Sequence, residues 1–576
     1  MFNNTGINYW DNDILIMSNF IIDNVDIYDG SGLEPVLGSV AVSGDRITAV
    51  GQVGSTMPVE VRIDGKGLAL APGIIDSHTH FDAQVTWDPM VTPSPQHGVT
   101  TALIGNCGFT IAPCHSRDRE LTMQNLVRVE GMSLEAMRAG INWGFESFDD
   151  YLALIERQGV GPNIAAFVGH SSVRTYVMGS DAPLRSATVD EVESMRRLVA
   201  AAMDSGAVGF ATSTSPSHNG ADGNPMPSRL AEHAELEALV GVLGDKGRGV
   251  FMLTKGGPTP VPFLETLAAD TGRPVVVAAL LHNSTDPDAV FNDLEAITAA
   301  QGRGHAMWGQ VSACPLSTEF TLLAPYPFEA LAAWKPAMQA ASPRHFRDLV
   351  SDALFRDSIR QELKRPAAVR LFNGEWEKLQ VLEVAKAKHR HYEGQSVASL
   401  AAAARVDPLD FMFDLALSEE LETTFLSVLL NSDESAVARL LTHEYSTVAL
   451  SDAGAHLTFF CDAGFGLHLM GHWVRDRQIM SLTEAIRRLS SHPAEIFGIR
   501  DRGRIEVGAF ADLLLFDPDT VGRGPSRRVW DLPAEQRRLT TDPLGVHGVW
   551  VNGTRIVSAD GVVPIDKLPG KVLREF

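Results

Sequence analysis

Two histidines, His78 and His80, stand at alternate positions shortly after the apolar run Ala71–Ile75. In a β-strand, residues two apart point to the same side, so both imidazoles and the carboxylate of Asp76 would face one space. Imidazole is a common ligand of zinc and similar divalent metals. The spacing therefore indicates either a metal site at the end of a strand or a pair of ordinary polar residues leaving it.

Other polar side chains also follow short apolar runs. His282 follows Leu280–Leu281, His170 follows residues 166–169, and Asp452 follows residues 448–451. A carboxylate in such a place can hold a metal-bound water, take its proton and pass it to a leaving amine. The alternatives are an aspartate that caps a turn and a histidine that merely ends a strand.

Alternating strands and helices must position these side chains. Amphipathic stretches such as Val189–Ser205 and Leu230–Gly244 separate most of the apolar runs, which is typical of a parallel α/β sheet. The candidate strands are Gly73–Ser77, Thr101–Ile104, Ile164–Val168, Ala207–Ala211, Gly249–Leu253, Val275–Leu281, Met307–Val311 and Thr447–Leu450. Eight strands with intervening helices predict a (β/α)8 TIM-like barrel over residues 71–500, with its active site at the carboxyl ends of the strands.

The segment from about 314 to 446 interrupts this alternation between the seventh and eighth strands. It contains the predicted helical stretches Phe328–Ala341, Arg344–Leu363, Ser396–Ala404 and Pro408–Leu417. An insertion on the catalytic face of a barrel is suited to a lid or a specificity element. A stabilising helical annex without ligand contact is the alternative.

The two ends of the chain have a different pattern. Residues 17–70 and 501–576 contain short apolar segments around turns such as Ser43-Gly44-Asp45 and Asn552-Gly553, which favour hairpins. We expect both ends to combine into one small β-sandwich domain, with two unrelated β appendages as the alternative. Residues 1–16 are expected to be a disordered lead-in.

Composition limits the partners and the compartment. The formal net charge of -23, from 48 basic and 71 acidic residues, argues against nucleic acid and against an anionic membrane surface. Four cysteines, including Cys461, imply no disulfide framework, so a reducing cytoplasm is the expected location. The first twenty residues lack the basic and apolar regions of a signal peptide, and no apolar run is long enough to span a membrane. A small-molecule substrate fits best, and a homo-oligomer stays open.

Several motifs, taken in order, resemble the metal-dependent amidohydrolase superfamily, and most closely its N-acyl-D-amino-acid deacylase (D-aminoacylase) branch. They are Pro72–His80, His97–Thr101, Gly105–Phe109, Ala166–His170, Gly206–Phe210, Ser451–Gly454, His492–Pro493 and Gly503–Pro518. The resemblance covers about residues 20 to 560. It implies a barrel with a β-sandwich from both termini, one or two divalent metals, zinc foremost, and hydrolysis of an amide.

The resemblance also implies a ligand set. Cys107 sits in the turn Gly105–Gly108, and that branch uses a cysteine at this place, whereas a lone buried cysteine is ordinarily inert packing. The metal ligands expected on these grounds are His78, His80, Cys107, Lys255, His282 and Asp452. Asp452 is also the expected general acid and base.

The chain departs from the branch at two places. The fifth strand is expected to offer a histidine, but Thr254 and Lys255 stand near that position. Lys255 could be carboxylated and bind metal, contact the substrate, or be a solvated strand end. After His282, Asn283 and Ser284 replace an expected lysine that anchors the substrate carboxylate.

Four further residues are candidates for contact with substrate. His170 is expected to line the pocket, Asn106 is a lesser candidate for the same work, and His456 is placed at the pocket mouth. Asn283 occupies the position of the expected lysine. His218, together with Arg229, lies in the loop 213–230, where an ordinary surface position is the favoured interpretation.

These observations predict a hydrolase of a linear amide, of the N-acyl-amino-acid deacylase type, in which a metal-activated water attacks the carbonyl and Asp452 moves the proton. Opening of a cyclic amide, as in hydantoinase- or dihydroorotase-like relatives, is the alternative reaction. A non-catalytic barrel scaffold is the alternative from another class.

Overall fold

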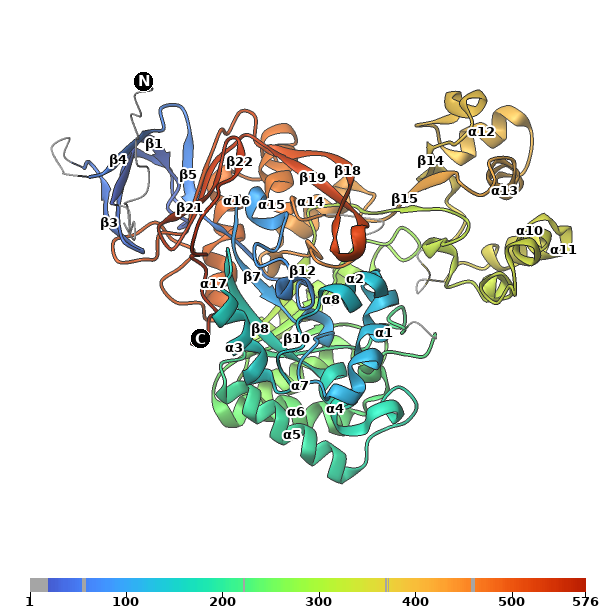
Figure 1. Ribbon diagram of the computed structural model, residues 1–576, viewed down its shortest axis with the longest axis horizontal. Helices are drawn as coiled ribbons and strands as arrows, with labels where there is room; N and C mark the ends of the chain where they lie inside the picture. Colours follow the sequence, from blue (N-terminus) through green and yellow to red (C-terminus); the bar gives the residue numbers. More distant parts are fainter. Residues whose placement is uncertain (1–18, 54–58, 221–222, 368–369, 371, 457–461) are drawn as a thin grey trace, which may run out of the picture.

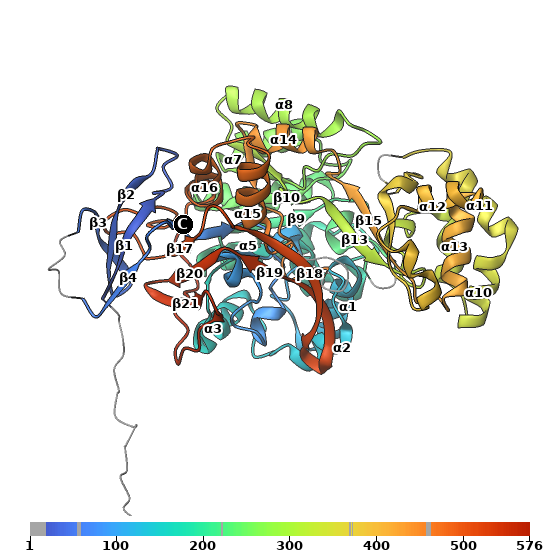
Figure 2. The same ribbon diagram turned by 90° about the horizontal axis from the view of Figure 1, so that it is seen from above.

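The structure is a computed structural model that describes residues 19–53, 59–220, 223–367, 370, 372–456 and 462–576. The expectations for residues 1–16 and for Cys461 lie outside these ranges. Every helix within them is too short or too polar to cross a lipid bilayer. Three parts follow one another along the long axis of the molecule: a β-sheet from both chain ends, a central barrel and an inserted unit (Figure 1, Figure 2).

The central part is a parallel sheet that contains all eight predicted strands. They are β6 (Ile74–Asp76), β7 (Val99–Ile104), β8 (Asn163–Gly169), β9 (Gly209–Ser213), β10 (Val250–Thr254), β11 (Val275–Ala278), β12 (Met307–Val311) and β16 (Ser446–Val448). Just beyond β6 and β16, the outer strands meet, because Thr79 forms a parallel bridge with Ala453 and the His80 N–H donates to the Ala453 carbonyl at 2.7 Å. The predicted (β/α)8 barrel is confirmed.

Helices cover the outside of this sheet (Figure 1). They include α3 (Phe148–Gln158), α4 (His170–Met178), α5 (Val189–Asp204), α6 (His233–Lys246), α7 (Val261–Thr271), α8 (Ala289–Gly302) and α14 (Glu434–Thr442). Strands β7 to β11 are buried along their whole length, as expected where helices cover the outer face and side chains fill the inner one. The sixth predicted strand ends earlier than expected, at Ala278 instead of Leu281.

The two chain ends combine into one β domain, as predicted, and its strands form one nine-stranded sheet. The N-terminal part supplies β1 (Phe20–Ile27), β2 (Val36–Ser43), β3 (Arg46–Gly51), β4 (Val61–Asp64) and β5 (Ala69–Pro72). The C-terminal part supplies β17 (Leu513–Phe516), β20 (Val546–Val551), β21 (Thr554–Ser558) and β22 (Gly561–Val562). The two parts join where β5 pairs antiparallel with β17. Phe20, Leu513 and Trp550 contribute to an apolar core separate from that of the barrel.

The remaining C-terminal strands leave this sheet. The hairpin of β18 (Gly522–Leu532) and β19 (Gln536–Leu544) extends across the barrel towards α2 (Leu134–Gly140) (Figure 2). Arg538 of the hairpin donates to the Thr92 carbonyl at 2.6 Å, and Arg528 pairs with Glu319 of the inserted unit. The hairpin therefore connects the C-terminal segment to both other parts.

The inserted unit is not purely helical, which corrects the sequence-based expectation. Its helices α10 (Pro343–Ser351), α11 (Ala353–Leu363), α12 (Val397–Ala404) and α13 (Pro408–Ser418) accompany a three-stranded antiparallel sheet. The strands are β13 (Leu316–Phe320), β14 (Leu379–Glu383) and β15 (Thr424–Leu430). Alternate residues of β15 are buried, the two-residue period of a strand with one covered face. The unit has its own aromatic core around Phe328 and Trp334, at the opposite end of the molecule from β1–β4 (Figure 1, Figure 2).

Candidate metal centre

Three metal-binding side chains converge where β6 and β7 end. His78 and His80 follow β6, and Cys107 lies in the turn after β7, where Gly105 and Cys107 itself adopt left-handed backbone angles. The Cys107 Sγ lies 3.5 Å from His78 Nε2 and 4.0 Å from His80 Nε2. One ligand atom from each of the three residues falls within 4.8 Å of the others, and all three residues are buried.

Polar groups behind the two imidazoles determine which nitrogen faces this space: a hydrogen bond at His78 and a nearby carboxyl group at His80. The Gln310 amide nitrogen donates to the Ser77 carbonyl at 3.3 Å, so its Oε1 faces His78 Nδ1 at 2.7 Å. Because an amide oxygen can only accept, His78 Nδ1 carries a proton, and Nε2 is the nitrogen directed at the space. His80 Nδ1 lies 3.2 Å from the Glu130 carboxylate, which leaves its Nε2 towards Cys107. A backing acceptor of this kind is the usual support of a metal-binding histidine.

Asp452 completes the group from the last strand of the barrel. Its Oδ1 lies 3.3 Å from His78 Nε2 and 3.6 Å from His80 Nε2. The residue follows β16 with a left-handed backbone, and Ser451 beside it donates to the His78 carbonyl at 3.3 Å. A carboxylate and three soft or borderline donors therefore surround one small space.

A cavity of about 60 Å³ opens from these side chains. Its other lining residues are Phe109, Val129, Glu130, His218, Thr254, Ala279, Leu450 and His456. His456 was expected at the pocket and lines it, whereas Glu130 was not singled out and His218 was given to the surface. Glu130 directly follows α1 (Arg119–Val129), and no pattern in its own segment predicts that helix's position over the barrel.

The structure does not bring Lys255 to the other donors. Thr254, the preceding residue, points inwards, with its Oγ1 3.0 Å from the Cys107 Sγ. Lys255 faces the opposite side of the strand, where its Nζ lies 2.8 Å from the Asp293 carboxylate of α8. The alternation of side chains along a strand allows only one of two neighbours to face the centre, and here it is Thr254.

His282 also lies apart from the group. Its backbone is fixed to Asn431, whose Oδ1 accepts from the His282 N–H at 2.8 Å. The ring is 6.3 Å from that of Phe291 on α8, and it does not line the cavity. Because β11 ends at Ala278, strand alternation no longer governs the direction of His282, and its expected role as a ligand stays a prediction.

His170, Asn106 and Asn283 form hydrogen bonds with other groups of the protein. Both ring nitrogens of His170 are used, with Nδ1 2.7 Å from Thr212 Oγ1 and Nε2 2.8 Å from the Glu235 carboxylate. The Asn106 amide donates to the Leu103 carbonyl at 2.8 Å. Asn283 accepts from the Thr285 N–H at 2.9 Å and thereby caps its own turn. The pocket positions expected for His170, Asn106 and Asn283 are not observed.

Comparison with known proteins decides the family. A model of the amidohydrolase family matches residues 62–557, most of the chain. The chain belongs to the amidohydrolase family. N-acyl-D-glutamate deacylase of Alcaligenes xylosoxydans xylosoxydans is 27% identical over 564 residues, which cover 96% of each protein. The family predicted from the motifs is confirmed, and this relative carries a name of the predicted branch.

Two solved structures place the fold of this amidohydrolase. N-acyl-D-glutamate deacylase from Bordetella bronchiseptica, complexed with zinc and a phosphonate inhibitor, matches with a TM-score of 0.66 at 24% identity, covering 97% of this chain and 99% of that one. A D-hydantoinase structure matches with a TM-score of 0.50 at 14% identity, over 97% of this chain and 99% of that one. The fold is therefore more similar to that of the deacylase.

Electrostatics make the centre of the amidohydrolase receptive to a cation. Burial alone would raise the pKa of the Cys107 thiol, but His78 and His80 outweigh it and bring this pKa to about 6. Burial would also raise the pKa of Asp452, yet the hydrogen bond from His80 and the charge of His78 hold it well below the usual range. Thiolate and carboxylate are the forms of these side chains that bind metals.

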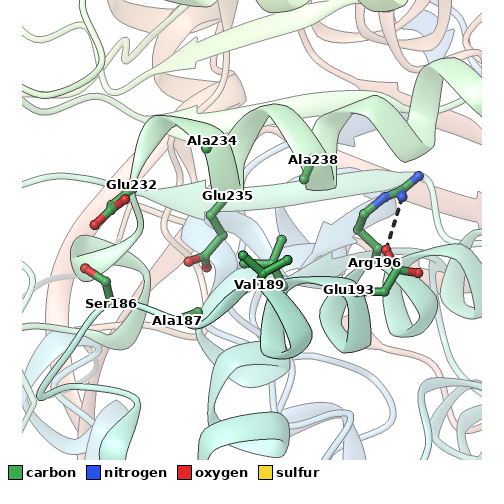
Figure 3. A pocket seen from close by; sticks show the side chains of 10 residues that line it. Ser186, Ala187, Val189, Glu193, Arg196, Glu232, Ala234, Glu235 and Ala238 are labelled. Carbon is green, nitrogen blue, oxygen red and sulfur yellow. Dashed lines mark hydrogen bonds and ion pairs between the residues drawn. The ribbon is translucent and has the colours of Figure 1, made fainter.

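A larger hollow of the amidohydrolase lies elsewhere, between α5 and α6, with a volume of about 380 Å³ (Figure 3). Arg196 and Glu193 pair on its rim at 3.2 Å, and the Glu235 carboxylate lies at its base. Glu235 is held by His170 and by Arg174, whose guanidinium donates at 2.6 Å. The hollow contains none of the converging donors, so the chemistry belongs to the smaller cavity.

Proposed function

We propose that this amidohydrolase uses a divalent metal ion, zinc foremost, to hydrolyse a linear amide of the N-acyl-amino-acid type. The observation that carries the proposal is the convergence of His78, His80, Cys107 and Asp452 on one small cavity. The name of the relative that matches 96% of this chain, N-acyl-D-glutamate deacylase, supports the substrate class. It favours an amine half with D stereochemistry.

The residues present fit zinc. Two imidazoles, a thiolate and a carboxylate are its usual ligands, and here all four are positioned by strand ends of one barrel. When bound, such an ion polarises a carbonyl and lowers the pKa of a water ligand towards neutrality. His78 and His80 offer their Nε2 atoms for this work because Gln310 and Glu130 face their Nδ1 atoms.

Asp452 has the position and the charge of the proton carrier. Its low pKa means that it begins the reaction as a carboxylate, ready to accept a proton from water. The carbonyl carbon gains a bond to the water oxygen and loses its bond to nitrogen. The proton held by Asp452 then passes to that nitrogen, so the products are a carboxylic acid and a free amine.

His218 is suited to bind the substrate carbonyl oxygen. The Ser213 Oγ accepts from the Ser215 N–H at 3.2 Å and lies 2.6 Å from His218 Nδ1. If the serine hydroxyl donates to Nδ1, the ring proton lies on Nε2 and is available to an acceptor in the cavity. Burial lowers the pKa of His218 to about 3, so the ring stays neutral and offers an N–H donor.

A substrate panel tests the reaction. Zinc-loaded protein is assayed with N-acyl-D-amino acids, N-acyl-L-amino acids, N-acyl amines and hydantoins, and release of free amine is measured. We expect turnover of the N-acyl-amino acids, with the D series preferred. Opening of hydantoins without cleavage of the linear amides would contradict the proposal and favour the cyclic-amide alternative. Zinc-loaded protein inactive on the whole panel would favour the scaffold.

The compartment and the domain division belong to the same proposal. We propose a cytoplasmic location, because Cys107 must remain a thiol to serve the metal, and neither Cys107 nor Cys114 forms a disulfide. We also propose a terminal β domain from residues 17–70 and 501–576 and a barrel from residues 71–500, into which the segment from about 314 to 446 is inserted as a third part. The separate apolar cores of the three parts support this division.

A further inference from the structure

A second, smaller cavity of about 20 Å³ adjoins the metal centre. Ala279, Leu450 and Asp452 line both cavities, so the two spaces are neighbours. We propose that the smaller cavity receives the side chain of the amine half, and that Asp462 there selects a small hydrogen-bond donor and rejects an acidic group. This inference rests on the hydrolase function proposed above and names its substrate more closely.

The smaller cavity lies at the ends of β11, β12 and β16, which are neighbours in the barrel sheet. Ser312 directly follows β12, and Asp452 follows β16. Leu316, the first residue of β13, lines the cavity from the inserted unit. Barrel and inserted unit therefore both contribute to its wall.

The proposed reaction directs the amine half into this cavity. Asp452 passes its proton to the leaving nitrogen, so that nitrogen must lie beside the Asp452 carboxylate. His218, which is suited to bind the carbonyl oxygen, lines the larger cavity and is not part of the smaller one. The substituent on the nitrogen then extends past Asp452 into the smaller cavity, while the acyl half stays on the side of His218.

Asp462 gives the smaller cavity a carboxylate. The side chain is buried, and Arg523 of β18 donates to its Oδ1. Burial raises the pKa of Asp462 to about 6, although the charge of Arg523 opposes this rise, so the carboxyl group is mostly ionised at neutral pH. An ionised carboxylate only accepts hydrogen bonds, so a ligand group that faces it must donate.

The rest of the lining favours a small group without negative charge. Among the described residues that line this cavity there is no lysine, arginine or histidine. An acidic side chain would therefore face Asp452 and Asp462 without a compensating cation, which weakens binding strongly. Leu281 and Leu316 add apolar surface, and the volume suits one small polar group. The α-carboxylate common to all N-acyl-amino acids must point away from this cavity.

N-acetyl-D-asparagine and N-acetyl-D-aspartate test the selection, because their side chains have nearly the same shape and differ in charge. With zinc-loaded wild type we expect kcat/KM for the asparagine derivative to be about a hundredfold higher. A ratio below about tenfold would overturn the proposal. Faster cleavage of N-acetyl-D-alanine than of the asparagine derivative would also overturn it, since it would show that the cavity prefers an apolar group.

Asp462→Asn assigns the selection to this residue. The substitution removes the charge and leaves Arg523 to attract an acidic ligand, so the asparagine-to-aspartate ratio should fall below about threefold. Asp542→Asn is the matched control, because Asp542 pairs with Arg527 in the same hairpin at 2.7 Å and does not line the cavity. Its ratio should match the wild type. An unchanged ratio in Asp462→Asn would show a purely structural role and overturn the assignment.

The wild-type ratio decides the matter even if circular dichroism shows that Asp462→Asn does not fold. The two proposals also fail separately. Cleavage that favours the aspartate derivative would remove the selection by Asp462 and leave the hydrolase function standing. If nothing in the panel is cleaved, calorimetric titration of the zinc-loaded protein measures binding of the same two derivatives. Tighter binding of the asparagine derivative would then support the subsite without the hydrolase function, and equal or absent binding would remove both.

Discussion

His78 and His170 invite comparison because both follow barrel strands and both are buried. At His78, one ring nitrogen is bonded to Gln310 and the other faces the cavity. At His170, Thr212 and Glu235 take both nitrogens. Position at a strand end is therefore shared by a metal donor and a structural residue. What separates them is whether one ring nitrogen remains directed at the cavity and its donor groups.

The same distinction divides the two walls of the barrel mouth. On the wall from β6, β7 and β16, acceptors behind the histidines leave the front atoms available to a ligand. On the wall from β8, β10 and β11, His170 and Lys255 form hydrogen bonds with carboxylates on the surrounding helices. The side chains on the first wall are available to bind a ligand, whereas those on the second wall stabilise the fold.

Asp452→Asn should have the largest effect and tests the binding wall. Loss of the proton carrier is expected to reduce kcat/KM by about a thousandfold, the scale of general acid–base catalysis. Zinc content is measured alongside, to separate loss of proton transfer from loss of metal. A variant that keeps a tenth of wild-type activity would contradict the role assigned to this carboxylate.

Glu235→Ala tests the structural wall. The substitution leaves the buried Arg174 guanidinium without its carboxylate, which should lower the free energy of unfolding by about 3 kcal/mol. Zinc content should stay unchanged. Glu193→Ala, in the exposed pair on the rim of the same hollow, is the matched control and should cost less than about 0.5 kcal/mol. Chemical denaturation measures both, and equal losses would show that burial does not set the difference.

The pH dependence of this structural wall follows from the same carboxylate. Burial would raise the pKa of Glu235, but the hydrogen bond and charge of His170 and the charge of Arg174 lower it from 4.5 to about 2. A lowered pKa means stabilisation that is complete above about pH 4.5 and is lost as the pH falls towards 2. The stability gap between wild type and Glu235→Gln should therefore be wider near neutral pH than at about pH 3. A gap that widens on acidification would refute this assignment.

Lys255→Ala should have the smallest effect. Its pair with Asp293 is partly exposed, so the loss of stability should be below about 1 kcal/mol. Activity should stay within about twofold of wild type, because the side chain does not face the cavity. Asp293→Ala should behave alike. A collapse of activity in Lys255→Ala alone would restore the carboxylated-lysine interpretation.

The sequence predicted the barrel well because its strands are short apolar runs bounded by turns, and β6 to β12 follow one another in space as in the chain. It also brought His78 and His80 to one side of a strand, because residues two apart in a strand point the same way. The direction of the Lys255 side chain was harder to predict, because an error of one residue in a strand end moves a side chain to the opposite face.

Other features were beyond a sequence pattern. Glu130 and His218 reach the cavity from a helix end and a loop, so only the packing of distant segments brings them there. His282 depends on its bonds to Asn431, 149 residues further along the chain. In the inserted unit, β15 alternates buried and half-buried positions within an almost continuous apolar run, which hides its period from the sequence.

The meeting of β6 and β16 has a mechanical consequence. Ser451 and His78, which touch there, are 373 residues apart in the chain, and the proposed ligands lie on both sides of this junction. A bound ion would act as a removable cross-link that closes a very long loop, and such a link restricts the unfolded chain more than a short-range one does. Chelation would then open the ring of strands at this junction first.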